Sequence, residues 1–128
     1  MTYVDCALAG YPAASRPRAA VAAQKGDHAG VLVVTEVPHE YPYLVACLRT
    51  QDGWIEGSSG TGRIQWRLTD EEQDRGVLYV WGRTEGAFPT VKVGGRMHEP
   101  TATADDGYWI LVLTEVPNSV IDDIEVRS

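Results

Sequence analysis

The densest group of reactive side chains in the sequence is an acidic cluster of Asp70, Glu71, Glu72 and Asp74. A calcium loop would need oxygen ligands that alternate along the chain, as in Asp-x-Asp-x-Asp-Gly, and this segment lacks that pattern. Two interpretations stay open. The cluster is a solvated, charged loop, or its negative potential attracts a basic protein. We take these residues as the candidate partner-binding site.

Histidines form the second candidate group. His39 precedes Glu40, His98 precedes Glu99, and His28 lies just before an apolar segment. Imidazole and carboxylate groups bind zinc and iron, so these residues would form a metal site if their loops converged. Their spacing matches no common ligand pattern. We therefore predict no metal site.

No motif for nucleophilic catalysis or cofactor binding is present. The sequence has neither a Gly-x-Ser-x-Gly elbow nor a recognisable Ser/His/Asp or Cys/His group. The glycine-rich segment 57–63 lacks the Gly-Lys-Ser/Thr with which a phosphate loop opens a helix, so we expect a mobile connection between strands. We predict no catalytic residue and no cofactor.

The cysteines and tryptophans fit structural roles. Cys6 and Cys47 lie on the apolar faces of alternating segments, which favours reduced, buried thiols over a redox pair. Trp66 and Trp81 lie on the apolar faces of predicted strands and should pack in the core. Only Trp54, beside a predicted turn, is expected at the surface, where it would be available for stacking on a ligand.

Charge and length narrow the classes of function. A chain of 128 residues suits one domain with a substantial core, which we place at residues 1–128. Eighteen acidic and eleven basic residues give a net charge of −7, with no basic stripe for nucleic acid or an anionic membrane. The first ten residues contain neither a basic leader nor a continuous apolar segment, so we expect a cytoplasmic protein.

Alternating and apolar segments separated by turn residues predict an all-β, single-domain antiparallel β-sandwich of about eight or nine short strands. A small β-barrel is the alternative. Residues 2–9 and 64–68 alternate between apolar and polar types, whereas residues 77–81 are apolar on both faces and indicate a central strand. The alanine-rich segment 18–25 is the one place where two turns of helix are considered. Residues 58–62 and 69–76 are expected to be loops.

An internal repeat supports this architecture. The segment Val-Leu-Val-Val-Thr-Glu-Val-Pro at 31–38 returns at 110–117 with only two aliphatic exchanges. Proline ends each run because it cannot donate a backbone hydrogen bond. A second alternating strand follows each copy, so we predict two hairpin-like units.

The C-terminal half resembles small immunoglobulin-like β-sandwich proteins of high-GC bacteria. The resemblance is carried by residues 76–82 and 91–93 and by the Asp-Gly-aromatic turn at 106–108, which precedes a long apolar strand. It implies the fold and transfers no functional residue. The Cys-Trp-Cys pattern of true immunoglobulin domains is absent, because Cys6 and Cys47 do not bracket a tryptophan.

Two hypotheses about function follow. The first is a non-catalytic cytoplasmic module that binds a protein partner in an accessory, immunity or adaptor role. The second is a small cofactor-free enzyme, such as a cyclase or isomerase, with a pocket between its sheets. A fully packed interior favours the first, and a pocket of several hundred cubic ångströms with convergent polar groups favours the second.

Overall fold

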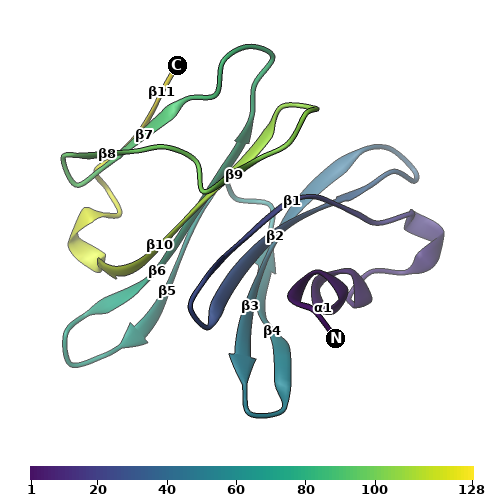
Figure 1. Ribbon diagram of the computed structural model, residues 1–128, viewed down its shortest axis with the longest axis horizontal. Coiled ribbons are helices and arrows are strands. Elements are labelled where there is room, and N and C mark those ends of the chain that lie inside the picture. The colour runs from purple at the N-terminus through teal and green to yellow at the C-terminus, as the bar shows by residue number, and fades with distance from the viewer.

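Three antiparallel sheets and one α-helix form the protein (Figure 1). The computed structural model describes residues 1–128. Sheet A has the order β1 (Arg18–Lys25), β2 (His28–Thr35), β3 (Tyr41–Thr50) and β4 (Gly53–Gly60). Sheet B has the order β5 (Ile64–Asp70), β6 (Arg75–Arg83), β10 (Tyr108–Pro117) and β9 (Ala102–Thr103). Sheet C has the order β11 (Ile124–Arg127), β7 (Thr90–Val93) and β8 (Arg96–His98).

The layers follow the order α1 (Tyr3–Ala9), sheet A, sheet B and sheet C, because a separate apolar cluster joins each neighbouring pair. Two short 3-10 helices, η1 (Ala13–Ser15) and η2 (Asn118–Val120), complete the chain. The prediction of an all-β sandwich in one domain is confirmed, although the chain forms eleven strands and not eight or nine.

The main core lies between sheets A and B. Its buried residues are Val21, Ala23, Leu32, Val34, Leu44 and Ala46 from sheet A, and Val77, Tyr79, Trp81, Tyr108, Ile110 and Val112 from sheet B. Of the two tryptophans predicted for the core, Trp81 is buried and Trp66 is half-buried. Val33, Val45, Val77, Tyr79, Ile110 and Val112 are also buried.

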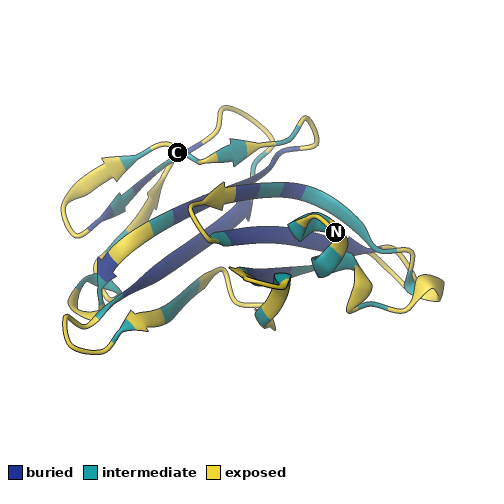
Figure 2. Cartoon of the chain, turned by 60° about the horizontal axis from the view of Figure 1, so that its bottom comes forward, coloured by how far each residue is buried: buried dark blue, intermediate teal, exposed yellow.

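The sequence of strand β2 is continuously apolar because both faces of the strand are buried. Leu32 and Val34 face sheet B, whereas Val31 and Val33 pack under α1. Successive side chains of a strand point to opposite faces, so a strand covered on both faces has no position that needs a polar residue. Strands β6 and β10 follow the same rule, because sheet C covers their outer face. Figure 2 shows these central strands buried along most of their length.

The prediction of a strand over residues 2–9 is wrong, because Tyr3–Ala9 form helix α1. A capping box starts the helix: the Thr2 side chain accepts a hydrogen bond from the Asp5 N–H at 3.1 Å, and the Asp5 carboxylate accepts one from the Thr2 N–H at 3.2 Å. Tyr3 and Ala7, and likewise Val4 and Leu8, are four residues apart, so the helix places them on one face that packs against sheet A. Ala7 is fully buried against sheet A as a result.

The helical interpretation of residues 18–25 is also wrong, because they form edge strand β1. The strand pairs with β2 from Arg18–Val34 to Lys25–His28. The helix propensities of the residues in this segment differ by less than about 1 kcal/mol each, so backbone pairing and burial decide the outcome. Small side chains let β1 lie close to sheet B, where Ala23 is buried.

The repeat is confirmed in part. Both copies lie in core strands, β2 and β10. Strand β2 ends at Thr35 and pairs with the following strand, β3. Strand β10 instead continues through Pro117, and β11 pairs with β7 of sheet C. The prediction of a second hairpin-like unit is therefore wrong.

Strand β5 turns its apolar face away from the main core. The half-buried Trp66 packs on the sheet C side, where its Nε1 donates a hydrogen bond to the Val116 carbonyl at 2.9 Å. Ile64 and Leu68, on the same face, are 43% and 41% exposed. Sheet C therefore covers only part of this face.

The polar face of β5 points between sheets A and B. A Cβ added to Gly57 would overlap the Arg67 guanidinium, and one added to Gly60 would lie 3.1 Å from Gln65 Nε2. Strand β4 thus carries glycines where the polar side chains of β5 approach it. The prediction of a loop at residues 58–62 is wrong for residues 58–60, because β4 extends to Gly60.

Candidate functional site

The predicted acidic site occupies the turn of the β5–β6 hairpin, and we call residues Asp70 to Asp74 the acidic turn. Thr69 and Asp70 belong to β5, so the loop is shorter than predicted. The Asp70 carboxylate accepts a hydrogen bond from the Gln73 N–H at 3.2 Å, and the Asp74 carbonyl accepts one from the Asn118 N–H at 3.2 Å. These bonds hold the turn in a defined shape.

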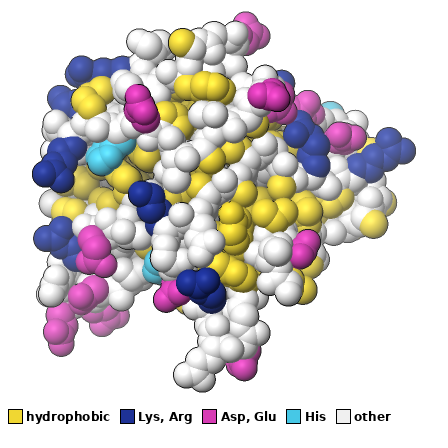
Figure 3. Space-filling model, viewed as in Figure 1, with side chains coloured by type: hydrophobic (Ala, Val, Ile, Leu, Met, Phe, Trp, Pro, Cys, Tyr) yellow, Lys and Arg dark blue, Asp and Glu magenta, His cyan; other side chains and the backbone are white.

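The carboxylates of the acidic turn have no cationic partner within the protein. Asp70, Glu71, Glu72 and Asp74 make no ion pair, whereas five other ion pairs exist in the protein. Figure 3 shows acidic side chains gathered at the lower left, where the β5–β6 hairpin lies in Figure 1. The four sequence-predicted residues therefore lie together, and their charge is not neutralised by the protein itself.

The exposed apolar residues of β5 adjoin this charge. Leu68 lies two residues before Asp70 on the same strand, and Ile64 lies four residues before Leu68. Strand β5 is also an edge strand, paired only with β6. The surface beside the acidic turn thus combines apolar side chains with unpaired backbone groups, and both are suited to contact with another chain.

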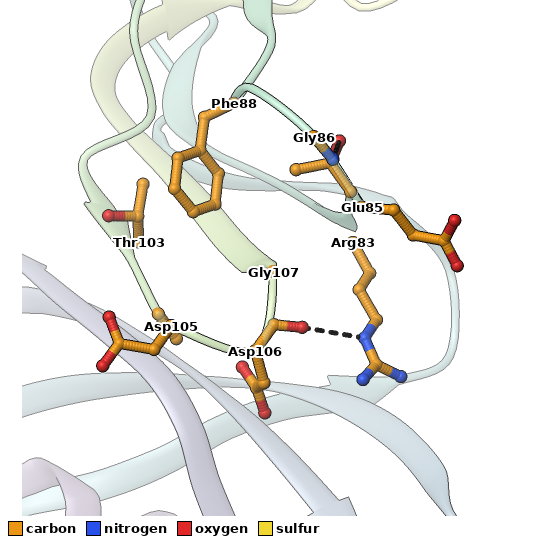
Figure 4. A pocket seen from close by; sticks show the side chains of 10 residues that line it. Arg83, Glu85, Gly86, Phe88, Thr103, Asp105, Asp106 and Gly107 are labelled. Carbon is orange, nitrogen blue, oxygen red and sulfur yellow. Dashed lines mark hydrogen bonds between the residues drawn. The ribbon is translucent and has the colours of Figure 1, made fainter.

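The largest hollow of the molecule, about 690 Å³, lies at a different place, between the segment after β6 and the turn before β10 (Figure 4). Glu85 and Asp105 lie on opposite sides of it and point away from one another. Arg83 is engaged by the protein: its Nε donates to the Asp106 carbonyl at 3.1 Å, and its Nη1 lies 3.3 Å from the Glu40 carboxylate. The hollow therefore offers no free cation for an anionic ligand, and its unpaired carboxylates Glu85 and Asp105 do not converge on one point.

The same network involves Tyr108. Its hydroxyl donates a hydrogen bond to Glu40 at 2.8 Å, and the Arg83 guanidinium lies 4.7 Å from the centre of its ring. Burial, followed by the hydrogen bond to Glu40, raises the pKa of Tyr108. These contacts tie the loop after β2 to sheet B and are structural.

The three histidines do not meet. His28 begins β2, His39 lies in the β2–β3 connection with its ring 6.1 Å from that of Tyr41, and His98 ends β8. No group of three or more His, Cys, Asp or Glu residues has a geometry that could hold a metal ion.

The two cysteines lie in the cluster between α1 and sheet A, both as free thiols. Cys47 is buried and its Sγ donates a weak hydrogen bond to the Tyr3 carbonyl at 3.8 Å. Burial, followed by the neighbouring Cys6, raises the pKa of Cys47 to about 12. Trp54 is half-buried because the ring of Tyr3 packs edge-on against it at 5.2 Å, so the expected exposed position is wrong.

Comparisons of the chain with protein-family models, with curated proteins and with solved structures find no match. No helix of the protein has the length and apolar character needed to cross a bilayer.

Proposed function

We propose that this protein is a cytoplasmic, non-catalytic β-sandwich module that binds a basic protein partner in an accessory, immunity or adaptor role. The contact surface is the acidic turn together with Ile64 and Leu68 on the outer face of β5. The resemblance to immunoglobulin-like sandwich proteins belongs to this proposal and is supported by the two facing antiparallel sheets.

One observation carries the proposal. Four unpaired carboxylates at a hydrogen-bonded turn border apolar side chains that the fold leaves uncovered. Charges of one sign accelerate the encounter with an oppositely charged partner, and apolar side chains slow dissociation once contact is made. The surface supplies both components within one hairpin.

The experiment compares the protein with two variants of equal charge. In the first, Asp70, Glu71, Glu72 and Asp74 are changed to Asn or Gln. In the matched control, the exposed and unpaired residues Glu85, Glu99, Asp122 and Asp123 are changed in the same way. A partner captured from the source lysate is identified, purified and used to measure association rates over a range of salt concentrations.

We expect the acidic-turn variant to associate about tenfold more slowly at low salt and to lose most of the salt dependence, while the control keeps it. A Leu68→Ser variant should instead raise the dissociation rate. Equal association rates in the acidic-turn variant and the control would reduce the turn to a solvated connection and overturn the proposal.

A cofactor-free enzyme is the second candidate function. The observation that favours it is a hollow of about 370 Å³ between sheets A and B, lined by His28, Arg67 and Tyr79 among others. This volume is within the range of ligand pockets.

A further inference from the structure

The space between sheets A and B, tightly packed at its centre, opens near β5 into a hollow of about 370 Å³. We call it the inter-sheet cleft; it is lined by His28, Cys47 and Leu48 of sheet A and by Arg67, Leu68, Thr69 and Tyr79 of sheet B. Arg67 and Tyr79 come from neighbouring strands of sheet B and project toward sheet A. The cleft thus places the polar side chains Arg67 and Tyr79 of sheet B opposite His28 and Leu48 of sheet A.

Two glycines of sheet A make room for these polar side chains. A Cβ on Gly30 would lie 2.9 Å from Tyr79 Cδ1, and a Cβ on Gly57 would overlap the Arg67 guanidinium. Neither glycine has a positive φ, so the absence of a side chain serves close approach and not an unusual backbone. The two positions form a cradle that any larger residue would fill.

The charge of Arg67 is uncompensated. Arg18, Arg49, Arg83 and Arg127 each pair with a carboxylate, whereas Arg67 is half-buried and makes no ion pair and no side-chain hydrogen bond. No enclosed side-chain nitrogen lacks a partner, so the unpaired Arg67 guanidinium opens to the cleft and is free to donate hydrogen bonds to an anion there.

The Tyr79 hydroxyl is the second unpartnered group. The residue is only 1% exposed, and its hydroxyl makes no hydrogen bond within the protein. No fully enclosed side-chain oxygen lacks a partner, so this hydroxyl borders the space of the cleft. Burial is the main reason that the pKa of Tyr79 rises to about 12. The hydroxyl is therefore a hydrogen-bond donor at neutral pH.

We propose that the inter-sheet cleft binds a small organic monocarboxylate. The carboxylate accepts hydrogen bonds from the Arg67 guanidinium and the Tyr79 hydroxyl, and the apolar body of the ligand lies against Leu48. A guanidinium matches the planar, two-oxygen geometry of a carboxylate.

The surroundings favour a single negative charge. Only Arg67 and His28 on the cleft wall are able to carry a positive charge. Because burial lowers the pKa of His28, this side chain is neutral at pH 7 and Arg67 is the one cation. Asp27 and Glu115 both lie close enough to act on His28. A dianion such as phosphate would meet these carboxylates with only one guanidinium to neutralise it.

The test uses hexanoate as the probe and hexanamide as its neutral counterpart. Each is titrated into the full-length protein while the side-chain Nε–Hε signal of Arg67 is followed by NMR. We expect hexanoate to shift this signal and to bind more tightly than hexanamide. Arg67→Gln should weaken hexanoate binding about 10- to 100-fold, the effect of losing charge-assisted hydrogen bonds, and Tyr79→Phe should weaken it about tenfold.

Two further variants keep the test decisive. Arg96→Gln removes the same charge from an exposed residue of β8 and should leave binding unchanged. Gly57→Ala keeps Arg67 but fills the space that its guanidinium occupies, so this variant should also weaken hexanoate binding. It takes the place of Arg67→Gln if that variant fails to fold. Equal affinity for hexanamide, no binding of hexanoate, or an equal loss in Arg96→Gln would each overturn the proposal. None of these outcomes bears on the acidic turn.

Discussion

Replacing Trp81 with alanine tests the main core at the point where it meets the crossover from sheet A to sheet B. The side chain is 6% exposed, and its Nε1 donates a hydrogen bond to the Gly62 carbonyl at 2.9 Å. Removing roughly 150–200 Å² of buried apolar surface at about 25 cal/mol per Å² costs about 4–5 kcal/mol. This agrees with the range of about 3–5 kcal/mol for large-to-small aromatic changes.

Urea denaturation followed by circular dichroism measures this loss. With a slope of about 2 kcal/mol per molar urea, Trp81→Ala should lower the midpoint by about 2 M. Trp81→Phe keeps most of the packing but loses the hydrogen bond, so it should cost about 1–2 kcal/mol. Val126→Ala, at a residue that is 48% exposed, should stay within about 0.5 kcal/mol of the wild type. A loss below about 1 kcal/mol in Trp81→Ala would refute the buried position.

Three other predictions follow from buried groups. Gly30→Ala should cost about 1–3 kcal/mol in the same assay, because its Cβ would lie 2.8 Å from Ile110 Cδ1 and 2.9 Å from Tyr79 Cδ1; an unchanged midpoint would mean that the sheets do not approach there. Burial lowers the pKa of His28 below its ordinary value of 6.5, so the unfolded chain binds more protons and the free energy of unfolding falls as the pH drops below about 6.5. The His28→Gln variant should lose this part of the pH dependence. Parallel profiles of stability against pH for the variant and the wild type would contradict the lowered pKa. Because the pKa of Cys47 is raised to about 12, iodoacetamide at about pH 8 should modify Cys47 only after unfolding, and mass spectrometry that finds it modified in the native protein would contradict its buried position.

The sequence predicts the strands that are buried on both faces better than the elements at the edges. Residues 31–34 and 77–81 carry a continuous apolar signal because both of their faces are covered, and their short length and many valines favour a buried strand over a buried helix. At the N-terminus, two periods compete over a short segment. There the Thr2 and Asp5 capping box was the available signal for a helix.

The orientation of β5 could not be predicted from its alternation. The pattern separates Ile64 and Leu68 from Arg67 but does not say which face turns inward. Part of the apolar face of β5 packs against sheet C, and the glycines of β4 leave room for the polar face. Both depend on segments distant in sequence. The acidic turn was predicted from local composition, whereas the cleft needs tertiary contacts to be recognised.

Both proposals depend on which face of β5 turns toward sheet A, and one NMR measurement tests this directly. In a NOESY spectrum of the wild-type protein, we expect cross-peaks between the Arg67 side chain and the Gly57 α-protons, because the guanidinium lies against that glycine. The Ile64 and Leu68 methyl groups should show none to Gly57. Cross-peaks from those methyl groups to Gly57, with none from Arg67, would show the strand turned the other way and would contradict both the uncovered apolar surface and the inter-sheet cleft.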